Sequence, residues 1–469
     1  MSDTTRFDRL GGRIVTTTKG PALHIDRPFL VLQLSAAAAA VLAALPATPD
    51  EIATQTGVPA ARVVKILETF EARQLVVRLS PRARTAAPRV TIVIPAYERQ
   101  DATVATIASL RELDYPADAL EILVVDDASP VPLDVGATRV LHLARNGGPA
   151  AARNAGLAAA TTELVAFVDN DCTVSHDWLG ILVGALEEPG VDIAGGRALA
   201  PRSGGILAGY EAARSPLDMG KVRGRVGLGK LVPYVPTTNL LVRRSAATAL
   251  DGFRSGMHLG EDVDFVWRAQ KASKIVYEPA ATVVHHHREQ LGAMLRRRAE
   301  YATSEALLAR LHPESRRTVL LPVTVLFALG ACQWSRFATL PALVAILLIA
   351  QEIIAKRAKL RALGLATSNV VGAVLRAHGA SLYHLSAATS RYQGVVLLVT
   401  AIAVAKLRLV VAILVFAYPI VDAGVRKSKI RLPFYVALYT LEMTAYQIGI
   451  AWGRLAHRSL DLPKIRLRR

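Results

Sequence analysis

The chain has 469 residues, a formal net charge of +18, an isoelectric point near 10.2 and 52% hydrophobic residues. This length predicts roughly two to four domains, and the positive charge favours anionic partners such as nucleoside diphosphates, anionic lipid or nucleic acid. Only two cysteines occur, Cys172 and Cys332, which excludes a disulfide framework and a cysteine zinc site and is typical of a reducing compartment. The first residues carry charges and no apolar core, so we expect no secretory signal.

Residues 10–80 predict a small domain of their own. A strand-like run at 31–34 precedes three helical segments, and another short strand follows at 75–77. The third segment has apolar residues at helical spacing, so one face of this helix is expected to pack on a core. Three helices followed by a strand are typical of a winged-helix domain. The residues that mark the helix ends are Ser35, Thr48, Pro49, Gly57 and Pro59.

The role of this domain stays open at this point. The third helix carries Arg62 and Lys65 but also Glu68 and Glu71, which is not the strongly basic face of a DNA-recognition helix. The stretch also resembles the small winged-helix domains that bind leader peptides of ribosomally made, modified peptides. Peptide recognition is preferred, and a purely structural role and nucleic-acid binding are the alternatives. A linker is expected at 81–89.

Residues 90–317 predict an α/β catalytic domain. Short apolar runs alternate with helical segments, which indicates a mostly parallel sheet covered on both faces. Ligands bind to such sheets at the carboxyl ends of the strands, where we expect Pro95, Asp126 and Asp169. The strands are expected at 90–95, 122–125, 140–143, 164–168 and 191–196, within 237–244 after a polar turn, and in a segment that ends at 283–287, and helices at 103–113, from 150 and from 261.

A pair of carboxylates follows the fourth of these strands. Asp169 and Asp171 are separated by one residue, and side chains alternate along an extended chain, so both are expected on one face. Two carboxylates on one face make a hard oxygen site that suits Mg²⁺ or Mn²⁺ bound to a diphosphate. A solvated acidic turn would have the same sequence, but the other polar strand ends favour a ligand site.

Four motifs in this order resemble the family 2 inverting glycosyltransferases, which have the GT-A fold. The motifs are Ile94-Pro-Ala-Tyr-Glu-Arg99, Val125-Asp-Asp-Ala-Ser129, Asn146-Gly-Gly-Pro-Ala-Ala-Ala-Arg-Asn-Ala-Gly156 and Val168-Asp-Asn-Asp171. The resemblance implies a binding site for a nucleotide sugar. Its implied base and ribose contacts are Pro95, Ala96, Tyr97, Glu98 and Asp127. Its implied diphosphate, ribose and metal contacts are Arg153, Asn154, Asp169, Asn170 and Asp171. Glu98 stands where this family often has asparagine.

The second half of this domain is expected to bind the acceptor. Residues 202–229 are rich in glycine and basic side chains and predict either an acceptor loop or a flexible surface loop. Glu261 and Asp262 open a helix, where acidic residues also stabilise the helix dipole. The resemblance implies that Asp262 is the general base, and one carboxylate is enough for direct displacement with inversion. Further candidates around the acceptor are Asn239, Glu261 and Arg268.

A strand that ends in three histidines adds a metal-ligand candidate. His285 and His287 share a face of the strand, and imidazole together with carboxylate suits Mn²⁺. In related GT-A enzymes a histidine of this region is a metal ligand. The resemblance therefore implies His285, ahead of His286 and His287, beside Asp169 and Asp171. Surface histidines at a strand end are the alternative.

Residues 318–469 predict an apolar helical region. The run 318–335 has no Asp, Glu, Lys or Arg and is long enough for one membrane span, whereas 337–351 is shorter, which indicates a hairpin or re-entrant pair. Later apolar runs are short or interrupted, and the last contains Glu442. Basic residues flank nearly every run, so interfacial helices fit better than spans, with a soluble helical domain as the alternative. The triplet Arg296-Arg-Arg298 predicts contact with anionic lipid or a solvated face.

Together, the three regions resemble the glycosyltransferases of mycofactocin systems over the whole chain. The resemblance implies transfer of glucose from UDP-glucose, with Mn²⁺ or Mg²⁺, to a peptide-derived redox-cofactor precursor, building a short β-linked glucan. Expected partners are the UDP-sugar donor, the modified-peptide acceptor and the cytoplasmic face of an anionic membrane, and no nucleic acid is expected. The alternatives are a polyprenyl-phosphate or lipid glycosyltransferase of the same family, and a non-catalytic scaffold that docks peptide through residues 10–80.

Overall fold

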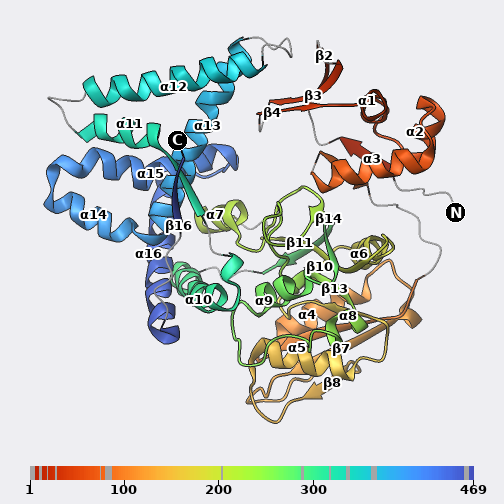
Figure 1. Cartoon of the computed structure of the whole chain (residues 1–469). Helices are drawn as coiled ribbons and strands as arrows, with labels where there is room; N and C mark the ends of the chain where they lie inside the picture. Colours follow the sequence, from red (N-terminus) through yellow and green to blue (C-terminus); the bar gives the residue numbers. More distant parts are fainter. Residues whose placement is uncertain are drawn as a thin grey trace. The chain divides into compact units, whose positions relative to one another are not determined.

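Two compact units make up the chain in the computed structural model (Figure 1). One holds residues 1–76, 295–306 and 316–469, and the other holds residues 77–294 and 307–315. The structure describes residues 6–9, 13–17, 20–26, 29–73, 75–79, 87–201, 204–286, 290–315, 318–333, 339–360, 367–458 and 464–468. Arg202, His287 and the expected linker, apart from residues 87–89, lie outside the described residues.

The amino-terminal part of the first unit has an antiparallel sheet followed by three helices. The strand order is β2-β3-β4, so β4 is an edge strand of this sheet among the described residues. The sequence did not predict the β2–β3 hairpin. The elements are β1 (Arg6–Arg9), β2 (Arg13–Thr17), β3 (Gly20–Asp26), β4 (Phe29–Gln33), α1 (Ala36–Ala43), α2 (Pro49–Thr56), α3 (Ala60–Ala72) and β5 (Val76–Leu79), and β5 pairs with β1.

The helix ends in this part follow the local chemistry of the sequence. Ser35 Oγ accepts a hydrogen bond from Ala38 N at 3.1 Å and caps α1. Thr48 and Glu51 form a capping box at the start of α2, and Gly57 ends that helix with a φ of 68°. The three predicted helices are therefore present, while the winged-helix assignment stays a prediction. The shared core contains Val41, Leu42, Ile52, Val63 and Leu67.

The second unit is built on a mixed sheet of nine strands. The strand order is β10-β14-β11-β13-β9-β6-β7-β8, and β12 pairs with β14. Strands β9, β6, β7 and β8 run parallel, whereas β13 is antiparallel to both neighbours. The predicted mostly parallel sheet is therefore confirmed, and β10, β12 and β13 are the strands that run antiparallel to their neighbours. The elements are β6 (Val90–Ala96), α4 (Gln100–Arg111), β7 (Leu120–Asp126), β8 (Arg139–His142), α5 (Gly148–Ala159), β9 (Leu164–Phe167), β10 (Cys172–Val174), α6 (Trp178–Leu186), β11 (Val191–Leu199), α7 (Ile206–Arg214), β12 (Gly224–Arg225), β13 (Leu240–Arg243), α8 (Arg244–Thr248), α9 (Glu261–Ala269), β14 (Lys274–His285) and α10 (Leu291–Leu311).

Two apolar layers cover this sheet, because side chains alternate between its faces along each strand. In β6, Ile92 and Ile94 join side chains of α4 and α6, whereas Val93 joins those of α5 and α9. Gly156 lets α5 approach the sheet closely, since a Cβ at this position would overlap Val93. Both faces are covered, so the strand ends are where a ligand reaches the sheet.

The carboxyl-terminal part of the first unit is mainly helical (Figure 1). The run 318–335, which is long enough for a span by its number of residues, does not form one long helix: residues 318–322 form a strand and the helix that follows has 11 residues, against about 20 for a span. Among the described residues, Thr339–Ala358 and Ala405–Val425 are helical, long and apolar enough to cross a membrane by length and composition alone. The elements are β15 (Thr318–Pro322), α11 (Val323–Gln333), α12 (Thr339–Leu360), α13 (Thr367–Tyr392), α14 (Gly394–Ala403), α15 (Arg408–Val425), α16 (Leu432–His457) and β16 (Lys464–Arg468), which pairs with β15.

A charged pair is buried among these helices. Arg298 of α10 donates to Glu442 of α16 at 2.9 Å, and each side chain is 6% exposed. The other two arginines of the basic triplet, Arg296 and Arg297, pair with Glu300 on the same helix. The triplet is therefore not a uniform lipid-facing or solvated strip, because its third member is inside the protein.

Candidate active site

The turn after β6 presents the first candidate residues at the edge of the sheet. Pro95 and Ala96 are buried inside the strand, while Tyr97 and Glu98 are exposed. Glu98 and Arg99 have φ angles of 56° and 55°, a left-handed conformation that is strained in residues other than glycine. Among the four predicted base and ribose contacts of this turn, Tyr97 and Glu98 are therefore the accessible ones.

The two aspartates at the carboxyl end of β7 have different surroundings. Asp126 is 1% exposed and accepts hydrogen bonds from the backbone N and the hydroxyl of Ser129 at 3.0 and 2.5 Å. Burial by itself raises the pKa of Asp126, but these hydrogen bonds outweigh it and hold the pKa below its usual value. Asp127 accepts from Gly147 N and Gly148 N at 2.9 and 2.7 Å. The predicted uracil contact Asp127 therefore fixes the turn that opens α5, and its contact with a base stays a prediction.

A buried arginine joins the two acidic motifs. Arg153 of α5 donates to Asp169 Oδ1 and to Glu261 Oε1, both at 2.7 Å, and its side chain is 4% exposed. Burial alone would lower the pKa of Arg153, but the charges of Asp169 and Glu261 raise it, so the guanidinium stays cationic. Neighbouring Asn154 instead exchanges two hydrogen bonds with the backbone of Phe253, at 2.7 and 2.8 Å. The predicted diphosphate contacts thus differ: Arg153 lies between the acids, and Asn154 fixes a turn.

Strand pairing brings Asp171 and His285 together. β10 and β14 are antiparallel with Cys172 opposite His285, and His285 Nε2 lies 3.3 Å from Asp171 Oδ1. Arg99 donates to the other carboxylate oxygen, Asp171 Oδ2, at 2.6 Å. The side chains of Asp171, Cys172 and His285 place their ligand atoms within 4.8 Å of one another. This group is able to hold a metal ion at the carboxyl end of the sheet.

The predicted metal ligands are brought together in part. Carboxylate oxygen and imidazole nitrogen suit Mn²⁺, whereas the Cys172 thiol, which the sequence did not suggest for this group, is a softer side chain beside them. Burial, together with the charges of Asp169 and Asp171, raises the pKa of Cys172 and keeps the thiol protonated. Asp171 and His285 belong to the group, whereas Asp169 pairs with the buried arginine.

The start of α9 carries the predicted base. Gly260 precedes the helix with a φ of 78°, and Glu261 and Asp262 follow in the first turn, where the helix dipole favours negative charge. Asp262 Oδ1 accepts from Val263 N at 2.8 Å. Burial and the neighbouring charge of Glu261 raise the pKa of Asp262 to about 7, against the opposing effect of Arg153. A carboxylate with a pKa in this range is a stronger base than an ordinary aspartate.

Three predicted site residues have structural partners inside the unit. Asn239 is 0% exposed, and its amide oxygen accepts from Trp178 Nε1 at 2.7 Å while its nitrogen donates to two backbone carbonyls. Arg268 donates to the carbonyls of Leu250 and Gly252 in the turn after α8, both at 2.7 Å. Asn170 donates to Thr103 Oγ1 at 3.1 Å. These residues position the turns around the site, and their contact with donor or acceptor stays a prediction.

A buried pair near the base was not predicted. Asp264 is 0% exposed, its Oδ1 lies 2.9 Å from His312 Nε2, and its Oδ2 accepts from Arg268 Nε at 2.8 Å. Burial by itself raises the pKa of Asp264, but the bonds with His312 and Arg268 outweigh it and hold the pKa below its usual value. The pair ties α9 to the residue after α10. The signal in the sequence was the third acid in Glu261-Asp-Val-Asp264.

The basic, glycine-rich stretch is anchored where the structure describes it, at 204–229. It contains α7 and β12. Arg223 donates to Glu188 and Glu278 at 3.1 and 2.9 Å, and Arg225 donates to Glu188 at 2.5 Å. A wholly flexible surface loop is therefore excluded for this part.

Comparison with known proteins decides the family. Residues 91–250 match the family described as glycosyl transferase family 2. The chain is 32% identical over 398 residues to the pre-mycofactocin glycosyltransferase of Mycobacterium tuberculosis (strain CDC 1551 / Oshkosh), covering 81% of this chain and 82% of that protein. The chain belongs to glycosyl transferase family 2. It is a glycosyltransferase with the GT-A fold, and the predicted resemblance to the mycofactocin group is confirmed.

Other relatives of the glycosyltransferase are more distant. The succinoglycan biosynthesis protein ExoO of Rhizobium meliloti (strain 1021) is 30% identical over 231 residues, which cover 45% of this chain and 64% of that protein. Among solved structures, the chain is similar to the mannosyltransferase PcManGT from Pyrobaculum calidifontis in complex with GDP-Man and Mn²⁺, with 17% sequence identity and a TM-score of 0.43. The match covers 78% of this chain and 88% of the mannosyltransferase chain.

The geometry of the glycosyltransferase combines a base with compensation of negative charge. Asp262 is a carboxylate of raised pKa, and Arg153 is a buried positive charge beside Asp169. Asp171 and His285 place a carboxylate oxygen and an imidazole nitrogen where they are able to hold a divalent cation. Such groups are able to remove a hydroxyl proton and to neutralise a diphosphate as it leaves.

Proposed function

We propose that this glycosyltransferase moves glucose from UDP-glucose, with inversion, to a peptide-derived redox-cofactor precursor and builds a short β-linked glucan. The relative of 32% identity is named pre-mycofactocin glycosyltransferase, which supports the acceptor class. The observation that carries the proposal is the bridge from Asp169 through Arg153 to Glu261. It joins the Asp-x-Asp turn to the helix start that bears Asp262.

The proposed mechanism is a single displacement. Asp262 takes the proton of the acceptor hydroxyl, and the acceptor oxygen bonds to C1 of the sugar. The bond between C1 and the diphosphate oxygen breaks on the opposite face, and its electron pair leaves with UDP. Arg153 orients Asp169 and Glu261 and offsets negative charge near them. A divalent cation, which Asp171 and His285 would hold, would supply further positive charge for the diphosphate.

The Asp262→Asn variant tests this mechanism. With UDP-glucose and a candidate acceptor, the wild type should add hexose units that mass spectrometry detects, whereas the variant should not. UDP should still bind the variant, as calorimetry would show, because the donor contacts remain. Full transfer by Asp262→Asn would exclude this residue as the base. A parallel assay with a polyprenyl phosphate separates the peptide acceptor from the lipid alternative.

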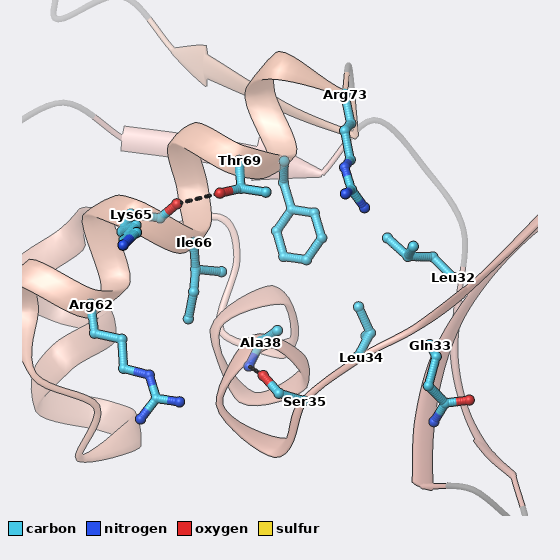
Figure 2. Close-up of a pocket in the computed structure, with 11 residues that line it drawn as sticks. Leu32, Gln33, Leu34, Ser35, Ala38, Arg62, Lys65, Ile66, Thr69 and Arg73 are labelled. Carbon is cyan, nitrogen blue, oxygen red and sulfur yellow. Dashed lines mark hydrogen bonds between the residues drawn. The ribbon is translucent and has the colours of Figure 1, made fainter.

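A specific observation favours a second function, the docking of the peptide acceptor on the amino-terminal part. A cavity of about 490 Å³ lies between the edge strand β4 and α3. Figure 2 shows Leu32 and Leu34 beside the cavity, with Arg62 and Ile66 reaching it from α3. The remaining lining residues are Gln33, Ser35, Ala38, Lys65, Thr69, Phe70 and Arg73.

The chemistry of this cavity suits an extended acidic peptide with apolar side chains. An edge strand offers unpaired backbone groups to an added strand, and the apolar floor accepts alternate side chains. Glu68 and Glu71, the two acidic residues of α3, do not line the cavity. Three basic residues line it, namely Arg62, Lys65 and Arg73. The face of α3 toward the cavity is therefore basic.

Charge reversal tests peptide docking. The double variant Arg62→Glu, Lys65→Glu should lower the affinity for a fluorescently labelled acceptor peptide, measured by anisotropy, by about tenfold or more. Glu68→Lys, also on α3 but outside the cavity, is the matched control and should keep the affinity. Equal affinity of the double variant and the wild type would exclude this docking site. Peptide binding without UDP release on any acceptor would favour the scaffold alternative over the enzyme.

We also propose that the helical tail holds the enzyme at the cytoplasmic face of the membrane. The apolar side chains of α12 support this, since Leu340, Ile346, Leu347 and Ile354 are each more than 60% exposed. Nucleotide-sugar donors are cytosolic, and basic residues flank the apolar runs.

A further inference from the structure

Each carboxylate of the Asp169-Asn-Asp171 turn faces an arginine from a different element. Arg153 of α5 donates to Asp169 Oδ1 at 2.7 Å, and Arg99, just before α4, donates to Asp171 Oδ2 at 2.6 Å. The sequence motifs assigned a role to Arg153 and none to Arg99. The two acids are thus neutralised by two different cations of the chain.

The two arginines differ in their freedom to change partner. The Arg153 side chain is 4% exposed and also pairs with Glu261, so it is held on two sides. The Arg99 side chain is 46% exposed. Its backbone is fixed, because the Arg99 carbonyl accepts from Thr103 N at 3.1 Å at the start of α4. The Arg99 guanidinium is therefore able to swing on a fixed base, whereas that of Arg153 is not.

Movement of the Arg99 guanidinium would change the surroundings of Asp171. Asp171 Oδ2 accepts a hydrogen bond from Arg99, and Asp171 Oδ1 lies 3.3 Å from His285 Nε2. Asp171 and His285 are the two residues that would hold a divalent cation. A cation that binds Asp171 meets the like charge of Arg99 within a few ångströms, where repulsion is strong. The diphosphate of a donor has oxygens that the displaced guanidinium is able to bind, because arginine binds phosphate through two parallel hydrogen bonds.

We propose that Arg99 is an exchangeable counter-ion of Asp171, which leaves this carboxylate when a divalent cation binds and then pairs with the diphosphate of the donor. This inference rests on the proposed use of a nucleoside diphosphate donor. Arg99 thereby couples the two ligands: it opposes the cation alone and favours the cation with the donor. The cation therefore binds most tightly when the nucleoside diphosphate donor is also bound.

Binding measurements on the full chain test this exchange without relying on turnover. The free Mn²⁺ signal in electron paramagnetic resonance gives the affinity for Mn²⁺ alone, and calorimetry gives the affinity for UDP in excess Mn²⁺. Arg99→Gln should bind Mn²⁺ about two- to fivefold more tightly than the wild type, the range for an exposed ion pair. It should bind UDP with Mn²⁺ about tenfold more weakly, because a charged hydrogen bond is lost.

Two further variants separate this exchange from general effects. Arg99→Lys keeps the charge and should keep the Mn²⁺ affinity of the wild type. Arg139→Gln removes a similarly exposed arginine that pairs with Glu121 at 2.5 Å and should change neither affinity. Unchanged or weaker Mn²⁺ binding by Arg99→Gln, with normal UDP binding by the wild type, would overturn the inference and leave the proposed function standing. Failure of the wild type to bind either ligand would overturn both.

Discussion

Arg153 and Glu261 stand 108 positions apart in the sequence, and their side chains meet at 2.7 Å in the interior of the catalytic unit. Replacing Arg153 by Met would leave the carboxylates of Glu261 and Asp169 without their buried cation. Breaking such a buried pair costs about 3–5 kcal/mol of unfolding free energy. Urea unfolding of the full chain measures this cost. Arg139→Met, which breaks an exposed pair, is the control and should cost less than about 1 kcal/mol. Equal effects of the two variants would contradict the importance of the bridge.

The raised pKa of Asp262 predicts how the rate depends on pH. Because burial and Glu261 raise this pKa to about 7, the carboxylate is mostly protonated at pH 6 and cannot accept a proton there. The value of kcat/KM for sugar transfer should therefore rise about tenfold per pH unit below 7 and level off above it. Asp101→Asn, on the exposed start of α4, should keep this profile. A flat profile between pH 5 and 8 would be inconsistent with Asp262 as the base.

The same shift predicts an effect on stability. A folded-state pKa above the unfolded value of 3.8 means that the folded protein binds the proton more tightly. The stabilisation from this proton is complete below the unfolded pKa and is lost as the pH rises through 7. Asp262→Asn, which never carries the charge, should therefore gain stability relative to the wild type between pH 5 and pH 8. Thermal unfolding across this range measures the change, and a constant difference would contradict it.

Asp264 predicts the opposite dependence on pH. The pKa of Asp264 is held below its usual value, because the bonds with His312 and Arg268 outweigh burial. The charged Asp264 therefore stabilises the fold above the unfolded-state pKa, and this stabilisation is lost as the pH falls through the folded-state pKa. Asp264→Asn should cost about 3–5 kcal/mol at pH 7, where it breaks a buried ion pair. The difference from the wild type should shrink below pH 4. An unchanged difference at pH 3, measured by urea unfolding, would exclude the charge of Asp264 as the cause.

Local signals predicted much of this fold. Ser35, Thr48 and Gly57 mark helix ends because each supplies a cap through its own side chain or backbone conformation. The apolar strands β6, β7 and β9 were found because both faces of the sheet are covered. The antiparallel position of β13 was not predicted, since direction depends on contacts between distant segments and not on local composition.

The candidate site was predictable as a set of residues and not as a set of roles. The motifs identified Arg153, Asp169 and Asp262, whereas the pairing of Asn154 with Phe253 and of Asn239 with Trp178 depends on distant turns. Polar residues that stabilise a turn and polar residues that bind a ligand have the same composition. Only the three-dimensional arrangement separates them, because it shows which hydrogen-bonding groups are already used.

Arg298 and Glu442 predict a strong coupling within the helical unit. Each side chain is 6% exposed, so Glu442→Leu alone leaves a buried arginine unpaired and should cost about 3–5 kcal/mol. Arg298→Met combined with Glu442→Leu replaces both charges by apolar groups and should recover most of that loss. A double-mutant cycle in thermal unfolding measures the coupling. Additive effects of the two substitutions would show that the pair does not interact.

The apolar tail predicts how the protein associates with membranes. Two stretches, Thr339–Ala358 and Ala405–Val425, are long enough to span, yet basic residues near the apolar runs favour attachment along an anionic leaflet. Each Lys or Arg near such a surface adds about 1 kcal/mol, and salt weakens this attraction. We expect the full-length chain in the membrane fraction, with high salt or carbonate releasing much of it. Release by detergent alone would show that these helices span. A monomeric chain in the soluble fraction at low salt without detergent would contradict both forms of attachment, and the exposed leucines of α12 would then need a protein partner.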